Sequence, residues 1–257
     1  MERCPGVGEL PNKGGVCMIY IGSKNRHAKE ILPITIKGRT PEQWYVEPFV
    51  GGANMIDKVD GNRIGADKHF YVIELLKAIR DGWIPPSVVT EEDYQKAKDS
   101  DDAKYKAFVG FCASYSGKWF GGYARGKDSK GNPRNYADEQ KRHLMKQAAG
   151  LRGIDFKSVE YDMLPIPPNS IIYCDPPYAG TTKYATGGFD HAAFWQWCRD
   201  KVAEGHRVFV SEYNAPDDWV CVWEKPVCSS LTADTGAKRN VERLFVHTSQ
   251  SKADGAI

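Results

Sequence analysis

The stretch Ser-Ile-Ile-Tyr-Cys-Asp-Pro-Pro-Tyr at residues 170–178 is the strongest indication of the fold. Residues 170–174 form a short, nearly continuous apolar run, which is typical of a parallel strand buried on both faces. Asp175 follows directly, and in open α/β sheets ligands bind in the crevice beyond the carboxyl ends of the strands. The stretch therefore predicts an α/β sheet with a site at the end of this strand.

The tetrad Asp175-Pro176-Pro177-Tyr178 is suited to the exocyclic amine of a nucleobase. Such an amine is a poor nucleophile because its lone pair is delocalised into the ring. Asp175 and the Pro176 carbonyl can accept its two N–H bonds and orient that lone pair, and consecutive prolines fix the backbone. Tyr178 offers a flat face on which a purine can stack. We interpret all four as catalytic residues; the alternative is a proline-stiffened turn with an aspartate cap.

Other segments alternate between strand and helix patterns. Strand patterns occur at residues 44–49, 63–66, 207–211, 220–223 and 242–247. Helix patterns occur at Val72, Leu75, Leu76 and Ile79, closed by Gly82, and again at residues 194–202. This alternation predicts a doubly wound, Rossmann-like α/β sheet.

Pro85-Pro86 interrupts the pattern, and the polar, basic and mostly helical region up to Gly153 reads as an insertion. We therefore predict a catalytic domain made of residues 1–84 and 154–257, with an inserted subdomain at residues 85–153.

Charge is concentrated in the insertion. The whole chain of 257 residues has a formal net charge of +2, whereas residues 117–152 contain nine basic and three acidic residues. Aromatic side chains are interleaved with these bases, which favours a nucleic-acid surface over the alternative, a solvated face.

The composition, 41% hydrophobic and 26% charged, is that of a globular protein. No apolar run reaches the length of a membrane span, and residues 1–15 lack a secretory signal. Seven scattered cysteines without a C-x-x-C pair indicate reduced thiols, and no metal site is expected. We expect a soluble, intracellular protein.

Two more segments are candidate ligand-binding elements. Residues 46–52 end a predicted strand in Gly51-Gly52, where the backbone can approach a ligand closely. Asp67 ends the next strand, where a carboxylate can accept the hydroxyls of a ribose or, alternatively, cap the following helix. Near the N-terminus, Ser23 is a plausible helix cap, and Lys24 is unfavourable in a first helical turn.

The elements Tyr20-Ile-Gly-Ser-Lys24, Glu47-Pro-Phe-Val-Gly-Gly52, Asp67 and Asp175-Pro-Pro-Tyr178, in this order, resemble the Dam-type (D12 class, alpha group) DNA adenine-N6 methyltransferases. The resemblance implies a Rossmann-like enzyme that uses S-adenosylmethionine, yields S-adenosylhomocysteine and needs no metal. It also implies that the inserted helical subdomain recognises the DNA target. The implied cofactor-binding residues are Tyr20, Lys24, Glu47, Pro48, Phe49, Gly51, Gly52, Asp67, Asp162 and Asp175.

Residues 108–126 are similar to the segment that enters the recognition domain in this family. Where GATC-specific members have Tyr-Asn-Gly-Leu-Cys-Arg, this chain has Tyr115-Ser-Gly-Lys-Trp-Phe120, so we expect a different target sequence. Residues 229–243 resemble the family's late basic loop. The predicted DNA-binding residues are Tyr115, Ser116, Lys118, Trp119, Phe120, Tyr123, Arg125, Lys127, Lys130, Arg134, Lys238 and Arg239.

The sequence therefore predicts an adenine-N6 DNA methyltransferase that acts on double-stranded DNA as a monomer, in the cytoplasm of a prokaryotic or phage-infected cell. Two alternatives stay open: another amino-methyltransferase, acting on cytosine N4, RNA or a protein glutamine, and a DNA-binding relative without catalysis. The target sequence, the biological role and any partner endonuclease do not follow from the residues.

Overall fold

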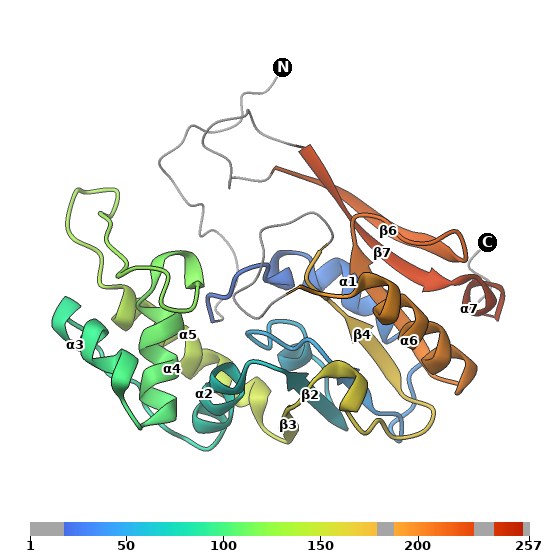
Figure 1. Ribbon diagram of the computed structural model, residues 1–257, viewed down its shortest axis with the longest axis horizontal. Coiled ribbons are helices and arrows are strands. Elements are labelled where there is room, and N and C mark those ends of the chain that lie inside the picture. The colour runs from blue at the N-terminus through green and yellow to red at the C-terminus, as the bar shows by residue number, and fades with distance from the viewer. Residues whose placement is uncertain (1–17, 179–187, 229–238, 254–257) are drawn as a thin grey trace. The chain divides into compact units, whose positions relative to one another are not determined.

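The computed structural model describes residues 18–178, 188–228 and 239–253 (Figure 1). Within them the fold is α/β, and seven strands form a mixed sheet. The chain divides into two compact units, which we call the N-terminal unit (Val16–Tyr173) and the C-terminal unit (from Cys174 onward). The α/β prediction is confirmed.

Four parallel strands form the core of the N-terminal unit. They are β1 (Tyr45–Glu47), β2 (Arg63–Asp67), β3 (Ile154–Ser158) and β4 (Ile171–Cys174), in the order β3-β2-β1-β4. Val46 lies opposite Ile64 on one side and Ile172 on the other. Every residue of β1 and β4 is buried, as the apolar run at 170–174 predicts. The sequence patterns predicted β1, β2 and β4 but not β3.

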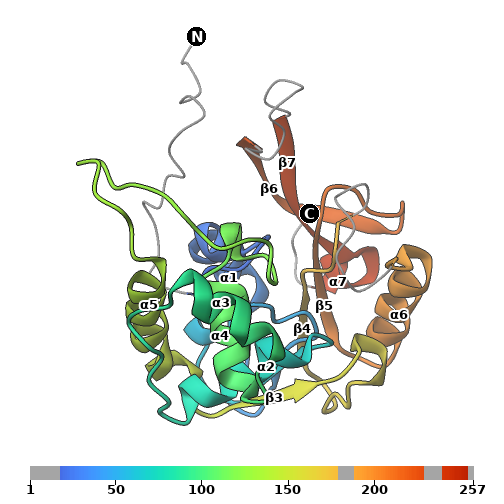
Figure 2. The same ribbon diagram turned by 60° about the vertical axis from the view of Figure 1, so that its left-hand side comes forward.

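The N-terminal unit also contains helices. They are α1 (Ala28–Thr35), α2 (Phe70–Arg80), α3 (Glu91–Lys96), α4 (Ala103–Cys112) and α5 (Tyr136–Leu151). Helix α2 contacts β3, α4 and α5, so that the three helices lie together (Figure 2). Its predicted stripe of Val72, Leu75, Leu76 and Ile79 is buried. The helix ends before Gly82, whose φ of +92° suits glycine at a helix C-terminus.

Short 3₁₀ turns connect the longer elements of this unit. They are η1 (Lys24–Arg26), η2 (Ile56–Lys58), η3 (Ala97–Asp99), η4 (Tyr115–Gly117) and η5 (Tyr161–Met163). The Ser23 hydroxyl accepts the Asn25 N–H, so Ser23 is a cap as predicted. It caps η1, however, because helix α1 starts later and is preceded by His27.

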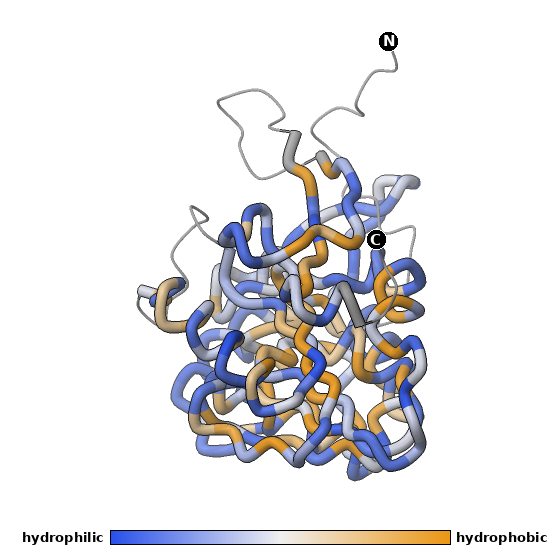
Figure 3. The backbone as a smooth tube through the Cα atoms, turned by 90° about the vertical axis from the view of Figure 1, so that its right-hand side faces the viewer, coloured by the Kyte–Doolittle hydropathy of each residue, from blue (hydrophilic) through white to orange (hydrophobic). Residues whose placement is uncertain are grey.

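Antiparallel strands form the C-terminal unit. They are β5 (Arg207–Glu212), β6 (Trp219–Cys228) and β7 (Arg239–His247), in the order β5-β7-β6, with the helices α6 (His191–Ala203) and α7 (Thr248–Ala253). Helix α6 packs on β5 and buries Phe194 and Cys198. Hydrophobic and hydrophilic segments alternate along the chain in Figure 3, as expected for elements that bury one face.

Free cysteines occur in both units, at Cys112, Cys174, Cys198 and Cys221, and the first three are buried. Among the residues that the structure describes, no helix is both long and apolar enough to cross a membrane.

Candidate active site

The loop after β1 turns sharply at Gly51, which has a φ of +47°. A Cβ at this position would lie 2.8 Å from Cε1 of Tyr20, and one at Gly52 would lie 3.0 Å from the Tyr20 Cβ. The Gly51 N–H donates to Oδ2 of Asp67 over 3.1 Å. Glycine is therefore required here by both the backbone angle and the close approach of Tyr20.

Asp67, at the end of β2, connects this loop to the next helix. Its Oδ1 accepts the N–H of His69 at 2.8 Å. Burial raises the Asp67 pKa from 3.8 to about 6, although the two backbone hydrogen bonds and nearby Lys68 oppose this shift. The residue that caps α2 is His69, so Asp67 is not the helix cap that the sequence left open as an alternative.

The segment before η1 is held by amide side chains from distant elements. The Met18 N–H donates to Gln147 Oε1 at 3.1 Å, and the Ile19 N–H donates to Gln140 Oε1 at 2.9 Å. Asn54 Nδ2 donates to Ser23 Oγ at 2.7 Å. These contacts hold the backbone on both sides of Tyr20.

Lys24 is only 7% exposed, and its Nζ donates to the Gly22 carbonyl at 3.3 Å. A buried lysine is costly for stability, which agrees with a role other than helix stabilisation. Glu47, at the end of β1, is also buried, with 3% of its surface exposed. Two charged residues of the predicted cofactor set are therefore withdrawn from solvent.

A third loop, after β3, approaches the other two. The Val159 N–H donates to the Asp67 carbonyl at 3.2 Å. The ring of Phe49 lies 5.3 Å from that of Tyr161, which is the first residue of η5. Asp162 is the next residue of η5 and is exposed. The structure thus brings together the ends of β1, β2 and β3, and with them most of the predicted cofactor residues.

The tetrad at 175–178 directly follows β4. Asp175 is half-buried, Pro176 is buried, and Pro177 and Tyr178 are half-buried. The Tyr178 hydroxyl donates to Glu242 Oε2 at 2.8 Å. The ring of Tyr213 meets that of Tyr178 edge-on, with centroids 4.6 Å apart and planes at 83°. No sequence pattern indicated that Glu242 or Tyr213, which lie 64 and 35 residues beyond Tyr178, would contact it.

The segment 115–123, predicted to read DNA, has both exposed and packed residues. Tyr115 is 58% exposed, and Lys118 is exposed as well. In contrast, Trp119 stacks on Tyr71 at 4.7 Å, and Phe120 lies edge-on to Tyr94 at 5.3 Å. The two large aromatic side chains at 119–120 therefore pack against helices of their own unit.

Some of the basic residues that we predict to bind phosphate already form ion pairs within the protein. Arg125 bonds Glu91, and Arg134 bonds Glu139 and lies 4.6 Å from the centroid of the Tyr136 ring. Lys127 and Lys130 are exposed on the loop between α4 and α5, without an ion-pair partner among the described residues. Lys238 lies outside the described residues, and Arg239 is the first residue of β7.

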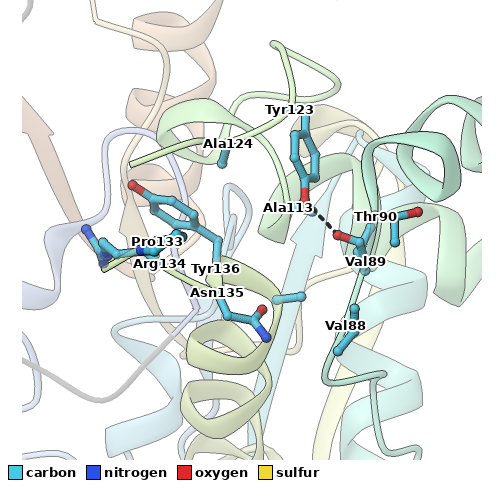
Figure 4. A pocket seen from close by; sticks show the side chains of 11 residues that line it. Val88, Val89, Thr90, Ala113, Tyr123, Ala124, Pro133, Arg134, Asn135 and Tyr136 are labelled. Atoms are coloured by element: carbon cyan, nitrogen blue, oxygen red, sulfur yellow. Dashed lines mark hydrogen bonds between the residues drawn. The ribbon is translucent and has the colours of Figure 1, made fainter. Parts of the chain in front are cut away.

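A pocket of about 250 Å³ lies between this loop and residues 88–90 (Figure 4). Its polar groups are hydrogen-bonded to one another or to nearby backbone. Tyr123 donates its hydroxyl to the Val89 carbonyl at 2.8 Å, and Asn135 donates its amide to the Ser87 carbonyl at 2.9 Å. The Thr90 hydroxyl is bound to Asp93. These contacts offer little polar chemistry to a ligand. Metal binding has no candidate either, since no cluster of three His, Cys, Asp or Glu occurs among the described residues.

Comparison with solved structures finds chains that match this one with low sequence identity and low TM-scores. A protein described as a methylase, HI0767 from Haemophilus influenzae, is 12% identical over 88% of this chain and 99% of its own, with a TM-score of 0.35. A protein described as a methyltransferase, SMU.472, solved in complex with SAH, is 11% identical over 87% of this chain and 52% of its own, also at 0.35. Similarity at this level does not establish a common function.

Sequence comparison is more specific. No curated protein matches the chain. The family profile of the D12 class N6 adenine-specific DNA methyltransferases matches residues 20–109, which contain Tyr20, Lys24, the Gly51 loop and Asp67. Residues 20–109 of this chain therefore match the D12 class N6 adenine-specific DNA methyltransferase family, as the motifs predict.

Proposed function

We propose that this chain transfers a methyl group from S-adenosylmethionine to N6 of an adenine flipped out of duplex DNA. The observation that carries the proposal is the tetrad Asp175-Pro-Pro-Tyr178 at the end of a buried parallel strand, in a chain whose residues 20–109 match the D12 class. The carboxylate and the carbonyl of this tetrad are the acceptors that an exocyclic amine needs.

The ends of β1, β2 and β3 fit the cofactor. Gly51 leaves room for close backbone approach, and Asp67 provides a carboxylate with the Gly51 and His69 amides already bound to it. Each carboxylate oxygen has a further lone pair for a ribose hydroxyl. We assign Asp67 to the ribose, the Gly51-Gly52 turn with Tyr20 and Lys24 to the methionine end, and Asp162 to the adenine of the cofactor.

The residues of the tetrad act on the substrate amine. Asp175 and the Pro176 carbonyl accept its two N–H bonds and direct its lone pair away from the ring, while Tyr178 stacks on the base. When bound, S-adenosylmethionine would supply one methyl group to N6 and would leave as S-adenosylhomocysteine, and N6 would release one proton to solvent water. The proposal requires neither a metal ion nor a covalent enzyme intermediate.

We assign residues 85–153 to target recognition as an inserted subdomain, with residues 1–84 and 154–257 as the catalytic domain. The exposed Lys127 and Lys130 support this assignment, because phosphates provide most contacts of a DNA-binding surface. We propose that the protein acts as a monomer in the cytoplasm, where the DNA of a prokaryote or its phage is found.

Transfer of labelled methyl to unmethylated duplex DNA, RNA and protein tests the function. We expect N6-methyladenine in the DNA arm only; N4-methylcytosine, or label in RNA or protein, would establish the alternative amino-methyltransferase. Absence of transfer in every arm, with DNA binding retained, would indicate a relative without catalysis.

We predict that Asp175→Ala abolishes transfer and leaves DNA affinity within about twofold, because Asp175 orients the amine and binds no phosphate. Asp217→Ala, which removes an exposed carboxylate of the same unit, is the control and should be as active as the wild type. Turnover by Asp175→Ala at the wild-type rate would refute the assigned role.

A further inference from the structure

The Tyr178 ring is held at two points by residues far away in the sequence. Its hydroxyl donates to Oε2 of Glu242 on β7 at 2.8 Å. The Tyr213 ring, which directly follows β5, stands at 83° to it with centroids 4.6 Å apart. The ring is therefore held by a hydrogen bond at its outer end and by a perpendicular aromatic neighbour.

Two neighbouring residues of strand β7 bind the two tyrosines, one through the Tyr178 hydroxyl and the other through the Tyr213 backbone. Arg243, the neighbour of Glu242, donates from its guanidinium to the Tyr213 carbonyl and, at 3.1 Å, to Glu224 Oε2. Arg243 is paired with Glu212 of β5 on one side and with Glu224 of β6 on the other. Because β7 is the middle strand of three, Arg243 is held on both sides, and Glu242, the preceding residue, is paired with Lys225 of β6.

The hydrogen bond to Glu242 restrains the outer end of the Tyr178 ring. Excursions of χ1 within its staggered well swing the whole ring and carry the hydroxyl with it. A bond from the hydroxyl to a carboxylate is stronger than a neutral one and opposes this swing. Swinging of the ring would displace a base stacked on it, and small displacements at a reacting centre lower the rate.

We propose that Glu242 is a positioning residue for methyl transfer: through its bond to the Tyr178 hydroxyl it fixes the position of the ring against which the target base stacks. This inference rests on the proposed function, in which Tyr178 contacts the base. In this proposal Glu242 acts through Tyr178 and not through contact with the base or the cofactor. A purely structural Glu242, important for the β6–β7 hairpin, is the alternative that the experiment must separate.

A double-mutant cycle distinguishes a positioning role of Glu242 from a purely structural one. Tyr178→Phe keeps the ring and removes the hydroxyl, Glu242→Ala removes the acceptor, and the third protein carries both changes. If Glu242 acts through Tyr178, each single variant lowers the single-turnover rate on unmethylated plasmid DNA about tenfold, or about 1.4 kcal/mol of barrier. The double variant then also loses about tenfold, because the bond is already gone in either single variant.

Three further measurements exclude a structural effect. Glu242→Gln retains an acceptor oxygen and should keep the rate within about threefold of the wild type. Asp200→Ala removes another hydrogen-bonded carboxylate from the same unit, on helix α6, and should leave the rate unchanged. The affinity for S-adenosylmethionine and the thermal midpoint should not change in Tyr178→Phe or Glu242→Gln.

An additive loss of about a hundredfold in the double variant would overturn this inference and leave the proposed function in place. A Glu242→Gln variant as slow as Glu242→Ala would overturn it too. Failure of the wild type to methylate DNA would instead overturn the proposed function, and this inference with it.

Discussion

Asp67 shows how one side chain connects local structure with ligand chemistry. It accepts the amides of Gly51 and His69, so it fixes the glycine loop and the start of α2 at once. Its burial raises the pKa to about 6, with Glu160 acting in the same direction and Lys68 against it. The carboxylate is therefore in its ionised, fully accepting form only above that pH.

We predict that affinity for S-adenosylmethionine weakens as the pH falls through 6. The ionised carboxylate accepts a ribose hydroxyl, and protonation removes that acceptor, so the contribution is present above the Asp67 pKa of about 6 and is lost below it. Calorimetric titration at pH 8 and pH 5 measures the effect.

Asp67→Asn is the matched control for this titration, because the amide does not ionise. At pH 8 the variant should bind the cofactor about tenfold more weakly than the wild type does. Its own affinity at pH 5 should equal its affinity at pH 8. Equal pH dependence in the wild type and the variant would show that another group titrates.

At the scale of elements, the loop between α4 and α5 differs from the uniform basic surface that the sequence indicates. Arg125 and Arg134 are engaged by Glu91 and Glu139. The remaining charge is carried by lysines such as Lys127 and Lys130, which are exposed near an antiparallel bridge between Lys127 and Pro133. Residues already neutralised by a carboxylate contribute less to phosphate binding.

We predict that changing Lys127 and Lys130 to Gln weakens binding to any duplex. The slope of log affinity against log salt should decrease in magnitude by about 1.8, because two phosphate contacts are lost. Arg134→Gln should leave that slope nearly unchanged and lower the thermal midpoint, since it breaks the Glu139 bond. Lys157→Gln, on β3, controls for overall charge. An unchanged slope in the double variant would show that the two lysines only face solvent.

The elements that the sequence predicts are those with a regular hydrophobic pattern or a clear terminating residue. Helix α2 has its apolar stripe and a closing glycine, and β4 is a buried apolar run. Strand β3 was missed because its end is exposed and polar, and α4 because it lies in a region that reads as polar. The bond from Tyr178 to Glu242 joins residues that are distant in sequence, so no local pattern can indicate it.

At the scale of the whole molecule, the proposed roles divide between the two units. The assigned cofactor residues before Asp175 lie in the N-terminal unit, whereas Asp175, Tyr178, Tyr213 and Glu242 belong to the C-terminal unit. The family profile matches residues of the first group only, and the roles proposed for the second group rest on the tetrad at residues 175–178. Changes at Asp67 should therefore act on cofactor affinity, and changes at Asp175 on turnover at saturating cofactor.

DNA specificity depends on which side chains the whole protein presents to base edges. GATC-specific relatives have an arginine at the position of Phe120 and an asparagine at that of Ser116. Here Phe120 packs edge-on against Tyr94 and has no hydrogen-bonding side chain. Trp119 is likewise held in a stack with Tyr71. Phe120 has no donor for a guanine, and the Trp119 ring is engaged by Tyr71, so base reading is assigned to exposed neighbours.

We predict that the methylated sequence is not GATC and that Lys118 reads one of its positions. Lys118 is exposed, and a lysine can donate to O6 and N7 of guanine in the major groove. Lys118→Gln should relax one base position, with a loss of about 1–3 kcal/mol of discrimination there and little change elsewhere. Sequencing of modified adenines in DNA from cells that express each protein measures both effects. Methylation confined to GATC, with rejection of sites that differ by one base pair, would refute this prediction.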